Sequence, residues 1–132
     1  MKLEELNIYQ LSMEIGEKIW TNTLKWDYFS TDTIGKQLVK AVDSISANIS
    51  EGFGRYHFKD RKNFCYYARG SLFETKTWLI KAYNRKLLPE SDLNAFLNEL
   101  EILGVKLNNY INFIGKTIND HKWLWMTINR NE

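Results

Sequence analysis

The side chains best suited to chemistry in this chain are Lys and Arg residues that alternate with aromatic ones in residues 52–86. This segment holds nine Lys and Arg residues against two acidic ones, which gives it a local charge of +7. Residues 1–51 and 87–132 carry charges of −3 and −2, so the net charge of the whole chain is only +2. Basic side chains can hold phosphates, and aromatic rings can stack on bases. The rings within the segment include Tyr56, His57, Phe58, Tyr66 and Tyr67.

This pattern predicts non-sequence-specific binding of RNA or DNA by a basic helical hairpin. The candidate phosphate contacts are Arg55, Lys59, Arg61, Lys62, Arg69 and Lys76. Two other interpretations fit the same charges. The segment can be a solvated helix face, or the protein can be a scaffold that docks a partner such as a polymerase without touching nucleic acid. The loop Gly52–Arg55 is not a P-loop, because it lacks the Walker spacing and the Lys-Ser/Thr ending.

Residues for catalysis or metal binding form no recognisable set. The two histidines, His57 and His121, lie far apart in the sequence, and no Glu-x-x-His pair marks a di-metal bundle. Cys65 is the only cysteine, so there is neither a disulfide framework nor a Cys-rich metal site, and we expect its thiol to be buried. We therefore predict a protein that is not an enzyme and that holds no metal and no cofactor.

A structural network of polar side chains is the second candidate site. It centres on the stretch Ser44–Arg55, which reads SISANISEGFGR and combines small residues with Asn48. Asn48 lies at the edge of an apolar stripe, and an amide there costs free energy unless it is hydrogen-bonded. A surface ion pair between Arg69 and Glu74 is the alternative for Glu74. The predicted network consists of Asn48, Glu51, Ser71 and Glu74.

Four amphipathic helices must position these residues. We expect the first over residues 3–26, the second after N-cap candidates in Ser30–Thr33, the third over 59–86 and the fourth over 92–116. Pro89 separates the last two, with Ser91 as the expected N-cap. The stripe of the second helix is Ile34, Leu38, Ala41, Val42, Ile45 and Ile49. The inward positions expected in the first are Leu6, Tyr9, Met13, Ile19, Trp20 and Leu24.

Side chains between the helices carry further expectations. Tyr28 and Phe29 are expected to seal the first turn. Small residues in the second and third helices should let the two touch, with Ala47 close to Gly70. The apolar stripe of the third helix is Phe64, Cys65, Ala68, Ser71, Leu72, Thr75, Trp78, Leu79 and Ala82. That of the fourth is Leu93, Phe96, Leu97, Leu100, Leu103, Leu107, Tyr110, Ile111 and Ile114.

The predicted fold is therefore all-α, a single-domain antiparallel up-down four-helix bundle over residues 1–118 with a short aromatic C-terminal tail at 119–132. The tail carries Trp123, Trp125 and Met126 and is expected to pack on its own bundle or on the next subunit. The N-terminus is too polar and acidic for a signal peptide, and no apolar run is long enough to span a bilayer. We expect a cytoplasmic protein with no membrane partner.

The segment Ser44–Phe53 resembles the hallmark of the 23S rRNA intervening-sequence protein family, whose relatives include the accessory proteins of diversity-generating retroelements. Leu6–Leu11, Gly35–Leu38 and Ala68–Glu74 support the match in the order and spacing of the family. The resemblance implies an up-down helical bundle and a homopentamer, a ring of five subunits with a positively charged surface. No catalytic residues are known for that family, so the resemblance assigns none.

Overall fold

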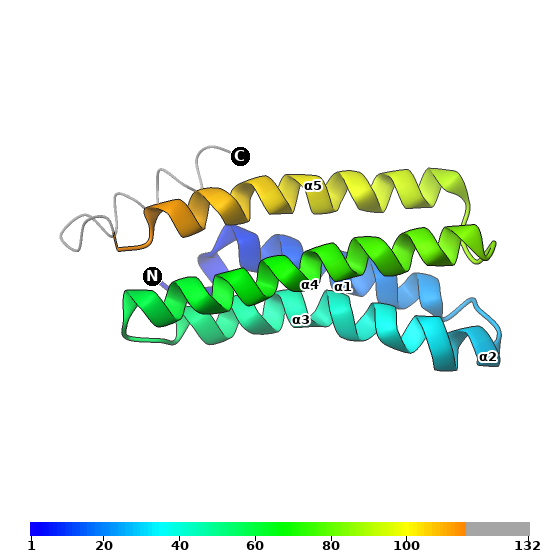
Figure 1. Ribbon diagram of the computed structural model, residues 1–132, viewed down its shortest axis with the longest axis horizontal. Helices are drawn as coiled ribbons and strands as arrows, with labels where there is room; N and C mark the ends of the chain where they lie inside the picture. The colour runs from blue at the N-terminus through cyan, green and yellow to red at the C-terminus, as the bar shows by residue number, and fades with distance from the viewer. Residues whose placement is uncertain (116–132) are drawn as a thin grey trace.

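The computed structural model describes residues 1–115, which fold into four long helices (Figure 1). These are α1 (Asn7–Thr23), α3 (Lys36–Phe53), α4 (Phe58–Asn84) and α5 (Glu90–Phe113). Three short helical segments accompany them, and residues 1–115 contain no strand. The short segments are a 3-10 turn at Leu3–Glu5, α2 (Tyr28–Ser30) and a π-helical turn at Thr31–Gly35 that leads into α3.

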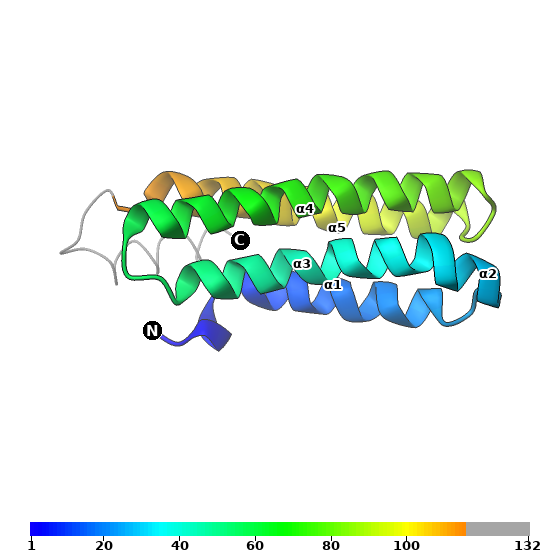
Figure 2. The ribbon, with the colours of Figure 1, turned by 60° about the horizontal axis from the view of Figure 1, so that its bottom comes forward.

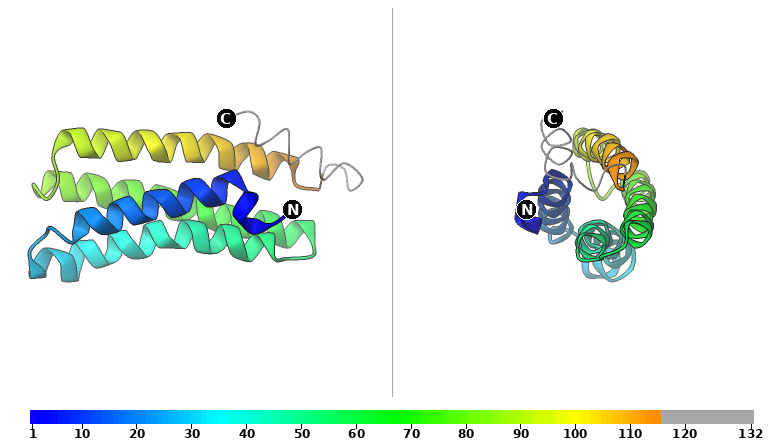
Figure 3. Two further views of the ribbon diagram at one scale, coloured as in Figure 1. Left: turned by 180° about the vertical axis from the view of Figure 1, so that it is seen from behind. Right: turned by 90° about the vertical axis from the view of Figure 1, so that its left-hand side faces the viewer.

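The long helices run alternately up and down, as Figure 2 shows, and confirm the predicted all-α antiparallel bundle. Seen end-on in Figure 3, they follow one another around the bundle in chain order. Helix α1 contacts α3 and α5, and α4 contacts α3 and α5. Helices α1 and α4 therefore occupy opposite corners, so their outward faces point to opposite sides of the molecule.

The core follows the predicted stripes closely in α3, α4 and α5. Every predicted stripe residue of α3 is buried, together with Ile34 just before it. Phe64, Ser71 and Trp78 of α4 and Leu97 of α5 are partly buried at the edge of the core, as is Ile114 beyond the end of α5. Helix-period burial of this kind supplies most of the stability of such bundles, because each apolar stripe is removed from water by its neighbours.

The predicted inward face of α1 is wrong at three of its six positions. Met13, Trp20 and Leu24 are 42%, 50% and 62% exposed. The buried side of α1 is formed instead by three isoleucines and small polar residues. Ser12 donates to the carbonyl oxygen of Tyr9 (2.9 Å) and Thr23 to that of Trp20 (2.8 Å), so their hydroxyls are satisfied inside the core. The buried residues include Ile8, Ser12, Ile15, Gly16, Ile19 and Thr23.

The ends of two helices also differ from the prediction. The cap before α2 is Asp27, which accepts hydrogen bonds from the Ser30 amide (2.9 Å) and hydroxyl (2.8 Å), rather than a residue of Ser30–Thr33. Pro89 is the N-cap of α5, so Ser91 lies inside its first turn. Tyr28 and Phe29 do not seal the first turn, because both are largely exposed.

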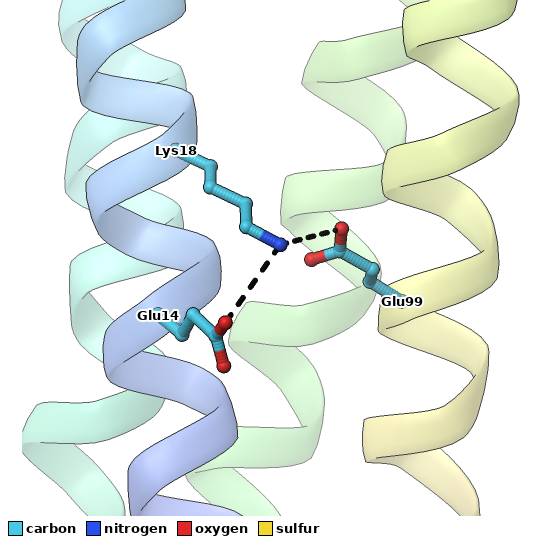
Figure 4. A network of polar contacts seen from close by, with 3 residues as sticks. All are labelled: Glu14, Lys18 and Glu99. Carbon is cyan, nitrogen blue, oxygen red and sulfur yellow. Dashed lines mark hydrogen bonds and ion pairs between the residues drawn. The ribbon is translucent and has the colours of Figure 1, made fainter.

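A polar link joins α1 to α5. The ammonium of Lys18 lies 3.1 Å from Glu99 of α5 and 3.9 Å from Glu14 of its own helix (Figure 4). Lys18 is therefore committed to two carboxylates.

Within residues 1–115, no helix combines the length and apolar character needed to cross a membrane. The predicted aromatic tail lies outside the described residues.

The expected contact between Ala47 and Gly70 is wrong. Both residues are exposed, and a methyl group on Gly70 would meet no atom within 4 Å. Small residues do meet in the middle of α3 and α4, but at Ser44 and Ser71, whose hydroxyl oxygens lie 3.0 Å apart. The tightest approach is at Gly52, where a methyl group would lie 2.9 Å from Cβ of Phe64 and 3.2 Å from the carbonyl oxygen of Arg61. The two helices therefore touch both in their middle and at the end of the hairpin.

Alanine substitutions at Gly52 and Gly70 should change the free energy of unfolding in opposite directions. We expect Gly52→Ala to lower the free energy of unfolding by about 1–3 kcal/mol, because backbone and Cβ atoms would have to move apart. Gly70→Ala should raise it by about 0.5–1 kcal/mol, because it removes backbone entropy from a helix interior without a clash. Urea denaturation measures both, and equal effects at the two positions would contradict this account of the packing.

Candidate nucleic-acid interface

The turn between α3 and α4 is held by its own basic side chains. The Arg61 Nε atom donates a hydrogen bond to the carbonyl oxygen of Arg55 at 2.6 Å. The Arg55 guanidinium in turn lies over the Phe64 ring, 4.8 Å from its centroid. Two of the predicted phosphate contacts therefore already have structural partners within the hairpin.

The six predicted phosphate contacts differ in how much charge they leave free. Arg55 forms an ion pair with Glu51 at 2.6 Å, and Lys76 forms one with Glu101 of α5 at 3.3 Å. Arg69 donates to the neutral amide oxygen of Asn108 at 3.0 Å, which leaves its charge uncompensated.

Two further cations are not paired. Among the described residues, neither Lys59 nor Lys62 forms an ion pair with a carboxylate. Among the described residues, the positive charge of the six that no carboxylate compensates is thus concentrated near the start of α4, on Lys59, Lys62 and Arg61, with Arg69 further along the helix. Arg61 differs from the two lysines because the carbonyl oxygen of Arg55 already holds its guanidinium.

A shallow groove lies beside these two lysines. Its volume is about 420 Å³, and it runs between the first turns of α4 and the end of α5. Tyr66, which is partly exposed, adds an aromatic ring to the groove, and Arg69 lies 5.0 Å from the centroid of that ring. The groove is lined by Phe58, Lys59, Lys62, Asn63, Tyr66, Ile114 and Gly115.

Aromatic side chains extend this site to the tip of the hairpin. Tyr56 is 88% exposed and meets the His57 ring edge to face, with 5.2 Å between the ring centroids. The sequence indicated the basic and aromatic residues of the hairpin. It gave no sign that Ile114 and Gly115 line the same groove, because they lie about fifty residues away along the chain.

The chain matches the family model described as 23S rRNA-intervening sequence protein over residues 4–109. It belongs to this family. A comparison with curated proteins found no match. The matched region includes α1, α3, α4 and most of α5, so this family member carries both its polar network and the two unpaired lysines inside the family domain.

The polar network of this family member is smaller than predicted. Asn48 donates to the carbonyl oxygen (2.8 Å) and hydroxyl (3.0 Å) of Ser44, and the Ser71 hydroxyl of α4 donates to the Ser44 hydroxyl at 3.0 Å. Glu51 and Glu74 lie outside this network. Glu51 pairs with Arg55, while Glu74 accepts from the Trp78 indole at 3.3 Å rather than pairing with Arg69. Ser44, four residues before Asn48, was the missed member.

Cys65 is buried, as expected, and desolvation raises the pKa of its thiol to about 12. The thiol therefore stays protonated at neutral pH and is a poor nucleophile. Burial likewise raises the pKa of Tyr110 to about 12. Within residues 1–115, no group of three His, Cys, Asp or Glu side chains lies close enough to hold a metal ion.

Truncation of Arg61, which holds the turn, and of Lys62, which does not, should have different effects on the free energy of unfolding. We expect Arg61→Ala to lower the free energy of unfolding by about 1 kcal/mol, because the Arg55 carbonyl loses a charged hydrogen-bond donor in the turn. Lys62→Ala, one residue later, should change it by less than about 0.5 kcal/mol, because this half-buried side chain forms no ion pair or hydrogen bond with the part of the chain that the structure describes. Chemical denaturation of both variants checks this, and a larger loss for Lys62→Ala would contradict it.

Proposed function

We propose that this protein binds RNA or DNA without sequence specificity at the hairpin end of its bundle, and that it has no catalytic role there. The observation that carries the proposal is the groove beside Lys59 and Lys62, two cations that form no ion pair with a carboxylate of residues 1–115. The two side chains lie three residues apart on α4, so they lie on the same side of the helix. Such a pair can contact successive phosphates of one strand.

Aromatic rings beside the cations suit a single strand or a loop better than a regular duplex. Tyr66 lines the groove, and Tyr56 stands exposed at the tip of the hairpin. Stacking on such rings tolerates any base, which fits binding without sequence readout. Arg69 supplies the next cation along α4. Arg55 and Lys76 contribute less, because carboxylates already compensate their charge.

Self-association would strengthen this binding. The family resemblance implies a homopentamer, and we propose that the chain forms one in the cytoplasm. A ring repeats the groove around one axis, so that weak contacts by single subunits add up on one nucleic-acid strand.

A protein-interaction scaffold is the second candidate function. It is favoured by a smaller cavity of about 110 Å³ between α4 and α5, which Phe73 and Val105 line together with Arg69 and Lys76. Both apolar side chains are more than half exposed. Charge reversal at the hairpin groove should leave docking of a partner protein at this second surface intact.

Salt dependence tests the nucleic-acid proposal. Fluorescence anisotropy with a labelled single-stranded oligonucleotide should show affinity that falls steeply as salt concentration rises. The double variant Lys59→Glu/Lys62→Glu reverses two phosphate contacts and should abolish binding at moderate salt. At lower salt, the slope of the logarithm of the binding constant against the logarithm of salt concentration should become shallower by roughly 1.4 per protomer engaged.

A matched charge change provides the control. Lys81→Glu/Arg85→Glu makes the same change in net charge near the other end of α4, and it should weaken binding far less. Equal losses in the two double variants would mean that net charge alone drives binding. Affinity that does not depend on salt would rule out phosphate contact at the groove.

A further inference from the structure

The outward side of α1 carries an apolar stripe that nothing in the described bundle covers. Met13, Trp20 and Leu24 lie seven and four residues apart, so their side chains follow one line along the helix. Each is exposed by two-fifths or more of its surface. A large exposed apolar stripe on a folded domain commonly marks a contact with another molecule.

Carboxylates without cation partners border this stripe. Glu17 lies on α1 between Met13 and Trp20, and Asp43 of α3 lies 3.2 Å from where a Cβ on Gly16 would be. Burial, and then the charge of Glu17, raise the pKa of Asp43. Neither carboxylate forms an ion pair among the described residues, and Lys18 is committed to Glu14 and Glu99. Lys40 is a basic neighbour on α3, one turn from Asp43.

The opposite corner of the bundle has the complementary surface. Tyr66, Phe73 and Ile80 recur every seven residues on α4, and all three are exposed. Phe73 is 59% exposed and lines the small cavity with Val105 of α5. Arg69 and Lys76 border it. This second stripe is apolar and flanked by Arg69, whose charge no carboxylate of the described residues compensates, and by the Lys76–Glu101 ion pair. The α1 stripe is apolar and flanked by carboxylates that form no ion pair among the described residues.

We propose that the α1 stripe of one copy docks on the α4–α5 surface of the next copy, head to tail, with Trp20 packing into the cavity beside Phe73. The occupant is a second copy because the charge of Arg69 beside the apolar cavity is complementary to the carboxylates of Glu17 and Asp43 beside the apolar α1 stripe. The proposal rests on the self-association proposed above.

Geometry supports an exchange between copies. Helices α1 and α4 occupy opposite corners of the bundle (Figure 3), so the two surfaces of one molecule cannot meet each other. Each copy then offers one surface of each kind, which is the arrangement that closes into a ring when the rotation between copies permits. Aromatic anchors such as Trp20 at the centre of an interface typically dominate its binding energy.

The interface would divide the basic residues of α4 between two tasks. Arg69, and Lys76 with its partner Glu101, would face the acidic stripe of the neighbouring copy, so that Arg69 would be available to a nucleic-acid strand only in a subunit whose α4–α5 surface is not covered. Lys59 and Lys62 lie nearer the end of the bundle, around the hairpin groove, and remain available for phosphates.

Two variants that each damage one surface test the proposal. Trp20→Arg brings a cation against the basic surface, and Phe73→Glu brings a carboxylate against the acidic stripe. By light scattering coupled to size exclusion, wild type should be oligomeric and each variant alone monomeric. An equimolar mixture should form a complex of two chains and nothing larger, because each variant keeps the surface that the other has lost.

Ile102 supplies the control, since it is an exposed apolar residue of α5 that belongs to neither surface. Ile102→Arg and Ile102→Glu should retain the mass of the wild type. Circular dichroism checks folding. If either test variant loses helicity, Leu24→Arg replaces Trp20→Arg and Ile80→Glu replaces Phe73→Glu, with the same outcomes expected.

Wild-type mass in both test variants, or variants that are monomeric and fail to pair when mixed, would overturn the proposed interface while leaving self-association intact. A monomeric wild type would overturn both. Nucleic-acid binding is decided separately by the Lys59→Glu/Lys62→Glu comparison.

Discussion

The close approach of α3 and α4 at Gly52 is the constraint on which the hairpin end depends. No side chain fits between this residue and the backbone of Arg61, so the two helices nearly touch before the chain turns. At that distance Arg61 can reach back to the Arg55 carbonyl and hold the turn. The first turns of α4, which follow this turn, line the groove together with the end of α5.

Local and tertiary partners reduce the positive charge that the hairpin sequence displays. The count of nine cations in residues 52–86 treats each as free. In the fold, Glu51 compensates Arg55 and Glu101 compensates Lys76, and Arg61 is bound to the backbone. Exposed pairs of this kind add little stability, because water already screens the charges. They do reduce the positive charge that each side chain presents to a phosphate. The start of α4 is therefore the part of the surface with the most available positive charge.

Much of the bundle could be predicted from hydrophobic spacing. In α3 and α5, leucine and isoleucine at three- and four-residue intervals are buried as expected, because this spacing places them on one face of each helix. Helix α1 misled this reasoning because it carries two candidate stripes. Ser12 and Thr23 are buried with their hydroxyls bonded to the backbone, while the larger Trp20 faces outward. Side-chain size therefore did not identify the inward face.

By itself, the sequence determined the four helices, the family hallmark and the basic character of the hairpin, because all of these depend on local spacing and composition, and the family resemblance implied the up-down arrangement. The tertiary structure alone decided that Glu101 compensates Lys76, that residues 114 and 115 complete the groove, and that Gly70 stands open while Gly52 is enclosed. Those features depend on distances between residues that are remote along the chain. A helical period gives the direction of a side chain around its own axis, but it says nothing of what the neighbouring helix places opposite.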